Sequence, residues 1–270
     1  MDNNKDYLYV DSSKDSQQTK FKVSKTSKIE YLINEKKYSK ALTLIDESLK
    51  NDSDQYYYFK AIIYDKQEDY EKSINFFNKI KNQSCEIKLL KSKVLYKWAK
   101  ISYFPALEYE KALELINEAL DTIPKNQDPS EYYFLKGEIL EALKDFIGAK
   151  KAYLIAYKEF EKLKEFEKQI EYLKNTDDIL INITGGYYYN FTPTNGMIVN
   201  LVKEPENEHD SDAIAVYLDK EKIGYVANSE YTLMDKVKSA SKLKNQISDN
   251  TSAEILFVYL DEYTIARIIF

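Results

Sequence analysis

The sequence predicts an α+β protein with two parts. The first is an N-terminal α-solenoid of helix-turn-helix repeats, and the second is a small C-terminal β-barrel-like domain with one or two helices. A six-residue phrase with an aromatic second position recurs four times between residues 29 and 175. Beyond residue 176 lie four of the six glycines and most of the short β-branched and aromatic runs. A chain of 270 residues has room for both parts.

The charge balance excludes a broad basic surface of the kind that attracts nucleic acid, because the net charge is −6. Residues 176–270 are the more acidic part, with 8 Lys and Arg against 15 Asp and Glu. The single cysteine, Cys85, excludes an intrachain disulfide and is expected to be a small buried side chain on a helix. The chain opens on no apolar leader and has no run of about 18 apolar residues. We therefore expect a cytoplasmic protein with no membrane contact.

Residues 1–28 are predicted to be a flexible tail. They are polar, with a stretch rich in Asp, Ser and Gln at residues 11–18. Such a segment buries too little apolar surface to offset the entropy that ordering costs.

Residues 29–175 have a helical pattern built on a repeated phrase. The four copies occupy residues 37–42, 69–74, 108–113 and 145–150. Their aromatic residues are spaced by 32, 39 and 37 positions, close to the period of about 34 that is typical of stacked helix pairs. Each phrase is expected to begin the second helix of a pair, and the helix at residues 158–174 is expected to cap the array.

This pattern resembles the tetratricopeptide repeat. A small residue stands where the family's two helices cross closely, and a bulky residue follows one turn later. The small residues are Ala41, Ser73, Ala112 and Ala149, and the bulky ones are Ile45, Phe77, Ile116 and Tyr153. Stacked pairs share one continuous core, which a single pair cannot form.

The resemblance implies a groove, lined by the first helix of each pair, that holds an unknown protein or peptide. The matching positions are Tyr58, Ile62, Asp65, Lys97, Ile101, Phe104, Phe134, Glu138 and Glu141. In the alternative interpretation, some of these aromatic side chains pack in the core instead.

Residues 176–270 contain about six strand-like runs, which is typical of a small barrel that binds nucleic acid or peptides. The runs lie at residues 179–184, 197–202, 213–218, 222–226, 253–260 and 264–270, and residues 230–243 have a helical pattern. Tyr187, Tyr188 and Tyr189 are expected to alternate across a strand, with at least one of them in the core. An acidic loop that contains Pro205 joins the second and third runs.

Residues 201–216, followed by Lys-Ile-Gly-Tyr-Val at 222–226, resemble the HIRAN domain. The resemblance covers residues 179–270 and implies a modified barrel that holds the free 3′ end of single-stranded DNA. Asp210 would accept a hydrogen bond from the 3′-hydroxyl, and Asn207 and the backbone of His209 would shape the pocket. Tyr188 or Tyr189 would stack on the terminal base.

Three positions depart from the members that bind DNA. Those members carry an Arg at the position of Tyr187, and basic or imidazole groups at the positions of Tyr225 and Asn228. Phosphate contacts supply most of the affinity for nucleic acid. Other cations near the site would come from Lys203, Lys236, Lys238, Lys242 and Lys244.

The same residues have structural alternatives. Asn207 and Asp210 are expected, in that case, only to hold the loop through local hydrogen bonds, and Gly224 to allow close packing. The five carboxylates of residues 204–212 suggest calcium, but the central Gly and terminal Glu of the calcium loop are missing. With one histidine, the chain has no Cys/His cluster for zinc.

No nucleophile or phosphate-loop motif is present, so we expect neither an enzyme nor a cofactor. The sequence therefore predicts a non-catalytic adaptor. Its repeats (residues 29–175) recruit a protein partner, and its HIRAN-like domain (residues 176–270) recognises single-stranded DNA. The alternative is a protein-only scaffold, in which the acidic HIRAN-like domain binds a protein.

Overall fold

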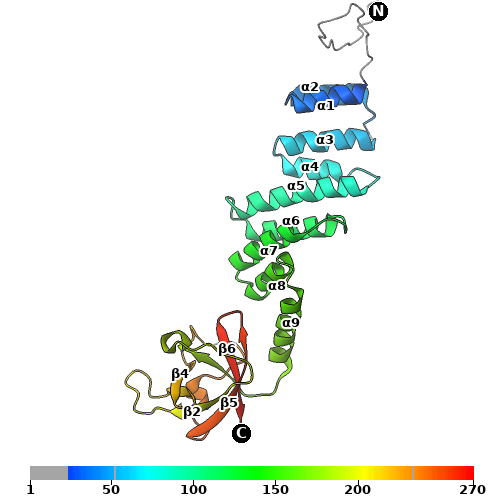
Figure 1. Cartoon of the computed structure of the whole chain (residues 1–270). Coiled ribbons are helices and arrows are strands. Elements are labelled where there is room, and N and C mark those ends of the chain that lie inside the picture. Colours follow the sequence, from blue (N-terminus) through cyan, green and yellow to red (C-terminus); the bar gives the residue numbers. More distant parts are fainter. Residues whose placement is uncertain (1–23, 52, 233) are drawn as a thin grey trace, which may run out of the picture. The chain divides into compact units, whose positions relative to one another are not determined.

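A computed structural model describes residues 24–51, 53–232 and 234–270 (Figure 1). The chain divides into two compact units, one ending at Asp145 and the other running from Phe146 to Phe270. Of the predicted flexible tail, residues 1–23 lie outside the described residues. Ser24 caps the first helix, with its hydroxyl accepting a hydrogen bond from the Ser27 N–H at 3.0 Å.

The described residues form nine helices followed by a barrel, which confirms the predicted α+β class. In the first unit, each helix packs against the next one along the chain (Figure 1). The helices are α1 (Lys25–Asn34), α2 (Tyr38–Ser48), α3 (Asp54–Lys66), α4 (Tyr70–Phe77), α5 (Cys85–Tyr103), α6 (Tyr109–Thr122), α7 (Ser130–Ala142), α8 (Phe146–Ala156) and α9 (Phe160–Asn175).

The repeated phrase marks the start of alternate helices, as its spacing predicts. The helices α2, α4, α6 and α8 each begin at the aromatic residue of a phrase. The small residues Ala41, Ser73 and Ala112 have no exposed surface, and Ala149 is 4% exposed. The Ser73 hydroxyl donates a 2.8 Å hydrogen bond to the Ala61 carbonyl oxygen of α3, so α3 and α4 approach closely at this position.

The turn before each of these helices contains a residue in the left-handed conformation. Two positions before the aromatic residue stand Lys36, Glu68, Leu107 and Lys144, with φ between 56° and 63°. At Glu68 the next N–H, that of Asp69, bonds back to the Tyr64 carbonyl oxygen at 2.9 Å. This bond closes the end of α3 in the manner of a Schellman turn, which usually has glycine at the left-handed position.

Replacing Glu68 with glycine is therefore expected to raise the free energy of unfolding of the first unit by about 1 kcal/mol, because glycine adopts positive φ without steric cost. The fluorescence of Trp98, the only tryptophan, follows unfolding of this unit in urea. Glu71→Gly is the control, because Glu71 is an exposed residue inside α4, where glycine is destabilising. Equal effects of the two substitutions would contradict the assigned turn.

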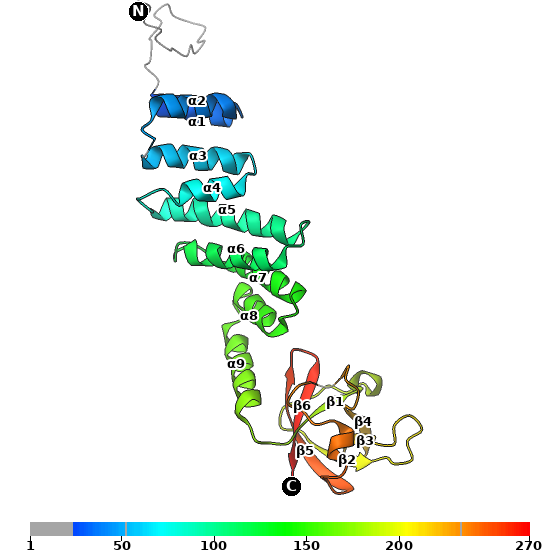
Figure 2. The same ribbon diagram turned by 180° about the vertical axis from the view of Figure 1, so that it is seen from behind.

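The second unit contains a closed antiparallel barrel with the strand order β1-β4-β3-β2-β5-β6 (Figure 2). Its core consists of inward side chains such as Ile181, Val199, Ile214 and Ile255, which alternate with outward ones along each strand. The strands are β1 (Leu180–Thr184), β2 (Ile198–Lys203), β3 (Ile214–Leu218), β4 (Glu221–Val226), β5 (Asn250–Tyr259) and β6 (Tyr263–Ile269). These bounds confirm the six predicted runs.

The predicted helix at residues 230–243 is wrong for most of its length, because only α10 (Ala240–Leu243) forms. The backbone before α10 makes two hydrogen bonds to residues of β1 in place of helical ones. The Lys238 N–H donates to the Leu180 carbonyl oxygen at 2.8 Å, and the Thr232 carbonyl oxygen accepts from Asn182 Nδ2 at 2.7 Å. Amphipathic spacing was present here, but pairing with the barrel replaced the helical bonds.

The helices α8 and α9 belong to the same compact unit as the barrel, although the predicted boundary lies after residue 175. Phe166 of α9 is 3% exposed and stacks on Tyr259 of β5, with ring centroids 5.5 Å apart. Leu180 and Ile265 complete this second cluster on the outside of the barrel. The outer face of β1, β5 and β6 is thus covered by α9.

Candidate nucleic-acid interface

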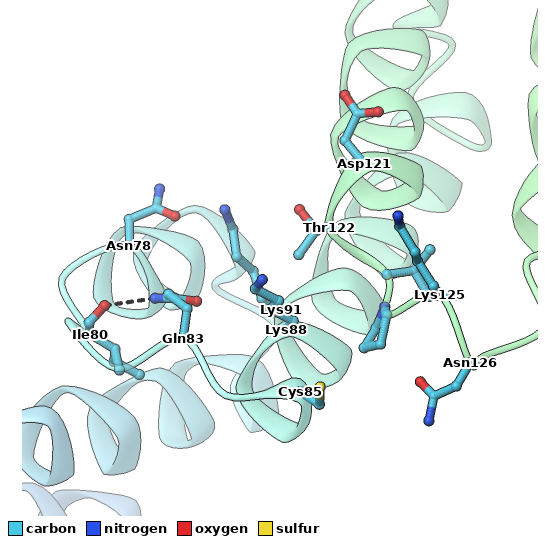
Figure 3. Close-up of a pocket in the computed structure, with 12 residues that line it drawn as sticks. Asn78, Ile80, Gln83, Cys85, Lys88, Lys91, Asp121, Thr122, Lys125 and Asn126 are labelled. Atoms are coloured by element: carbon cyan, nitrogen blue, oxygen red, sulfur yellow. Dashed lines mark hydrogen bonds between the residues drawn. The ribbon is translucent and has the colours of Figure 1, made fainter.

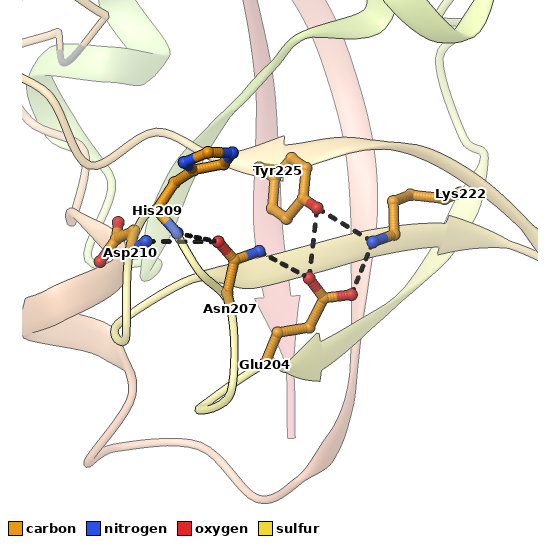
Figure 4. A network of polar contacts seen from close by, with 6 residues as sticks. All are labelled: Glu204, Asn207, His209, Asp210, Lys222 and Tyr225. Atoms are coloured by element: carbon orange, nitrogen blue, oxygen red, sulfur yellow. Dashed lines mark hydrogen bonds and ion pairs between the residues drawn. The ribbon is translucent and has the colours of Figure 1, made fainter.

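The loop between β2 and β3, residues 204–212, is held by a single amide side chain. Asn207 Oδ1 accepts hydrogen bonds from the N–H groups of His209 at 3.0 Å and Asp210 at 3.2 Å (Figure 4). The ends of the loop are closed by the Glu204 N–H, which donates to the Ala213 carbonyl oxygen at 2.9 Å. The Asn207 side chain therefore forms an Asx turn. The His209 side chain is exposed.

Asp210, the predicted acceptor of the 3′-hydroxyl, is half-buried and joins the loop to the end of β4. Its Oδ2 accepts from Asn228 Nδ2 at 2.8 Å, and its Oδ1 accepts from the Asp212 N–H at 2.9 Å. The Asn228 Oδ1 in turn accepts from the Ser241 N–H at 3.0 Å. These are the local bonds of the structural alternative, although a carboxylate has room for further hydrogen bonds.

An ion pair lies beside this loop. Lys222 Nζ of β4 contacts Glu204 Oε1 at 2.6 Å, and the Tyr225 hydroxyl donates to Glu204 Oε2 at 3.2 Å. Asn207 Nδ2 reaches the same Oε2 at 3.0 Å (Figure 4). Both charged side chains are about three-quarters buried, at 24% and 23% exposure. Lys222 was not among the predicted site residues, and the signal available in the sequence was Tyr225, three positions further along the same motif.

The ion pair changes the acidity of both partners. Burial opposes the charge on Glu204, but the hydrogen bonds from Lys222 and Asn207 outweigh it and hold the pKa of Glu204 below its usual range. Burial likewise opposes the charge on Lys222, whereas its bonds to Glu204 and Tyr225 raise the pKa of Lys222. The pair is therefore ionised at neutral pH.

Because the pKa of Glu204 is lower in the folded than in the unfolded protein, its contribution to stability is complete above the unfolded pKa and is lost as the pH falls through the folded pKa. As the pH is lowered from about 5 to about 3, we expect the denaturant concentration at the unfolding midpoint of the barrel unit to decrease. This decrease should be steeper for the wild type than for Glu204→Gln. Denaturation at several pH values measures this, and parallel curves would contradict the ionic role of Glu204.

The three consecutive tyrosines lie on a 3₁₀ turn, η1 (Gly186–Tyr189), and not on a strand. Gly185, at φ 83°, turns the chain out of β1, so the expectation that one ring enters the core is wrong. Tyr187 is 91% exposed, Tyr188 86% and Tyr189 39%. Exposed rings on a short, hydrogen-bonded turn are available to stack on flat ligands.

Tyr189 connects the tyrosine turn to the acidic loop. Its ring centroid lies 6.5 Å from that of Tyr225, and Tyr225 in turn bonds to Glu204. Burial and a hydrogen bond with Tyr225 raise the pKa of Tyr189. Through these contacts Tyr189, Tyr225, Asn207, Asp210 and Asn228 form one continuous surface.

Tyr187 and Tyr188 also line a hollow of about 400 Å³, together with Phe191 and residues of β1 and β6. Asn182, which lines it too, has a buried Oδ1 without a hydrogen-bond partner among the described residues. The rim includes the carboxylates of Asp261 and Glu262, so this hollow repels phosphate while its rings favour apolar contact.

Of the five lysines expected to supply cations, two are neutralised by carboxylates of the unit. Lys203 pairs with Asp249 at 3.4 Å, Lys244 pairs with Asp212, and Lys238 bonds to Gln246. Lys236 and Lys242 are exposed and form no ion pair with the described residues. Lys203 and Lys244 can therefore contact phosphate only by breaking an internal pair, whereas Lys236, Lys238 and Lys242 have no carboxylate partner among the described residues.

Residues 177–244 match the family model of the HIRAN domain. This match contains the tyrosine turn, the acidic loop and β4, and it ends within the segment that follows α10. The helical region lies outside the match. No curated protein matches the chain.

Outside the HIRAN domain, the predicted groove residues lie on α3, α5 and α7, except Phe104, which directly follows α5. Lys97 Nζ pairs with Asp65 at 2.7 Å, so these two positions are adjacent, and Glu138 lines a hollow of about 370 Å³ with Tyr103 and Phe104. Tyr58 and Ile62 are half-buried between two apolar clusters. Ile101, Phe104 and Phe134 are exposed by 41%, 68% and 39%, and Glu141 is exposed as well.

A larger hollow of about 810 Å³ lies between the start of α5 and the end of α6 (Figure 3). Lys88, Lys91 and Lys125 line it, together with Cys85 (Figure 3). Cys85 is exposed, so the expectation that it is buried is wrong: it is the first residue of α5, where its side chain faces the hollow.

The described residues contain neither a metal-binding cluster nor a membrane-spanning helix. No group of three or more His, Cys, Asp or Glu side chains is arranged to hold a metal ion. Among the described helices, none combines the length and the apolar character needed to cross a bilayer.

Proposed function

We propose that the chain is a binding protein without catalytic activity, whose HIRAN domain holds single-stranded DNA at its 3′ end. The observation that carries the proposal is the tyrosine turn: two rings are more than 85% exposed, next to a third that contacts Tyr225 of β4. HIRAN domains are generally associated with DNA binding. Stacking of a base on an aromatic ring contributes about 1–3 kcal/mol and requires no positive field.

The acidic loop supports recognition of an end in preference to the middle of a strand. Asp210 repels phosphate but suits a sugar hydroxyl, which donates to the lone pairs left by Asp212 and Asn228. A strand that ends in a 3′-phosphate would place two negative groups together. Substituting Asp210 would also release Asn228 and loosen the loop, so the end of the DNA is the better variable for a test.

We expect a labelled single strand with a free 3′-hydroxyl to bind more tightly than the same strand with a 3′-phosphate, at low salt and in fluorescence anisotropy. Tyr188→Ala is expected to weaken this binding by about 1–3 kcal/mol, because it removes a stacking surface. The matched control is Tyr231→Ala, since Tyr231 is also 86% exposed in the same unit but lies outside the tyrosine turn.

Each result excludes one part of the proposal. Absence of binding at low salt would reject DNA as the ligand. Binding that ignores the 3′-phosphate would reject end recognition, and equal effects of the two tyrosine variants would reject stacking on the turn. If DNA does not bind, the pairing of Lys203, Lys222 and Lys244 with carboxylates favours the alternative, a protein scaffold with an acidic HIRAN domain.

We also propose that the helical region is an array of the tetratricopeptide type that recruits a protein. The regular helix starts, the buried small residues and the exposed side chains of Ile101 and Phe104 support this. This recruitment is tested by affinity capture with the wild type and with Phe104→Ser, followed by quantitative mass spectrometry of the captured proteins. Partners that are retained equally by both proteins would count against a groove at the end of α5.

A further inference from the structure

Three donors converge on the carboxylate of Glu204. They are Lys222 Nζ at 2.6 Å, Asn207 Nδ2 at 3.0 Å and the Tyr225 hydroxyl at 3.2 Å (Figure 4). The orientation of the Asn207 amide is determined, because its oxygen already accepts from two backbone N–H groups. One cation and two neutral donors around a single anion have the composition of an oxyanion-binding site.

The Glu204 side chain is not required to close the loop that it begins. The loop ends are joined by the Glu204 N–H and the Ala213 carbonyl oxygen, and the turn itself is held by Asn207 and Asp210. The three donors are likewise positioned by β4 and by the Asx turn. An external anion can therefore replace the carboxylate without unfolding the loop.

The surroundings of the three donors indicate which anion. Lys222 Nζ lies 4.8 Å from the ring centroid of Tyr225, whose own ring lies 6.5 Å from that of Tyr189. A strand with a base on the tyrosine turn would carry its phosphates past this position. The pair is also about one-quarter exposed, so the site is open to solvent.

We propose that Lys222, Tyr225 and Asn207 form a phosphate site for the DNA backbone, and that Glu204 occupies this site as an internal competitor in the unbound protein. The inference rests on the proposed function and assigns its phosphate contact to a residue outside the predicted set. Binding exchanges a carboxylate for a phosphate at Lys222. The free energy needed to break the Lys222–Glu204 pair offsets much of the free energy gained from the phosphate contact, which keeps the affinity of the wild type for DNA low.

The test compares the wild type with Glu204→Gln in anisotropy titrations of a single strand with a free 3′-hydroxyl, over a series of salt concentrations. Glutamine keeps the shape and one acceptor but releases Lys222. We expect about 5-fold tighter binding at low salt, and a plot of log K against log salt that is steeper by about 0.7. The wild type contacts the same phosphate, but its freed carboxylate takes up a cation and cancels the counterion release at this position.

Two controls separate the site from general charge. Glu206→Gln removes an exposed carboxylate from the same loop, so its effect is expected to stay below about 2-fold and to leave the slope unchanged. In the double variant Glu204→Gln/Lys222→Gln, the gain in affinity and slope should disappear. In the wild-type background, Lys222→Gln should weaken binding more than Lys220→Gln, which removes an exposed lysine of the adjacent turn.

The outcomes distinguish this inference from the function on which it rests. If the wild type binds DNA and Glu204→Gln binds with the same affinity and slope, the internal competitor is refuted while DNA binding stands. Equal effects of Lys222→Gln and Lys220→Gln refute the phosphate site, even if Glu204→Gln fails to fold. If neither the wild type nor Glu204→Gln binds at low salt, both proposals are overturned.

Discussion

Gly224→Ala is expected to unfold the barrel, with a loss of about 3–4 kcal/mol in the free energy of unfolding of its unit. An added Cβ would lie 2.4 Å from the Thr184 carbonyl oxygen and 3.2 Å from Ile183 Cγ2. Both atoms belong to β1, which is paired with β4 at this point. Neither backbone can move away without breaking the pairing that closes the barrel.

Because the two compact units can unfold separately, the measurement for Gly224→Ala must resolve them. Hydrogen exchange with mass spectrometry should show lost protection in peptides of β1 and β4, whereas the fluorescence of Trp98 in α5 should report a normal transition of the first unit. Gly186→Ala is the control, because its Cβ would have ordinary contacts of 3.6 Å or more. Normal protection in Gly224→Ala would disprove the close approach of β1 and β4.

Phe166→Ala is expected to destabilise the barrel unit by about 3–5 kcal/mol, the usual cost of deleting a buried phenyl ring. Phe166 belongs to α9 but is 3% exposed, and it stacks on Tyr259 of β5 in the cluster that contains Leu180 and Ile265. Lys150 of α8 lies 5.1 Å from the ring centroid. The substitution would leave a cavity where α9 covers the strands.

The control for this prediction lies in the same helix. Phe160 is 52% exposed at the start of α9, so Phe160→Ala should change the stability of the unit by less than about 1 kcal/mol. Exchange protection in β5 and β6 is the readout. If Phe166→Ala frees only α9 while both strands stay protected, the helix is merely docked and the barrel folds without it.

Much of the helical region could be predicted because its signals are local. The aromatic residue at the second position of each phrase, and the small residue three positions later, depend on neighbours within one helix pair, as at Tyr70 and Ser73. The six strands were predicted for the same reason, since alternation is a property of a short segment. The helix at residues 230–243 failed because its backbone bonds to Leu180 and Asn182, far away in the sequence.

The candidate site was predictable only in part. Within the loop, Asn207 and Asp210 bond to backbone groups two or three positions away. Contacts of this kind can be predicted from the sequence, because Asn and Asp side chains often bond to nearby backbone groups. The exposed tyrosine turn was not predicted, because a 3₁₀ turn and a strand accept the same aromatic run. The signal available for the turn was Gly185, because the chain leaves β1 at this residue in a left-handed conformation.

By itself the sequence determined the division into repeated helices and a strand-rich HIRAN domain, because helix period, strand alternation and a motif within one loop all depend on near neighbours. Only the tertiary structure decided that α9 belongs with the barrel and that Glu204 meets Lys222 across 18 residues. These contacts join segments whose approach depends on how the barrel closes. The charge of a site depends on which distant side chains the fold brings together, and those contacts form only when the chain has folded.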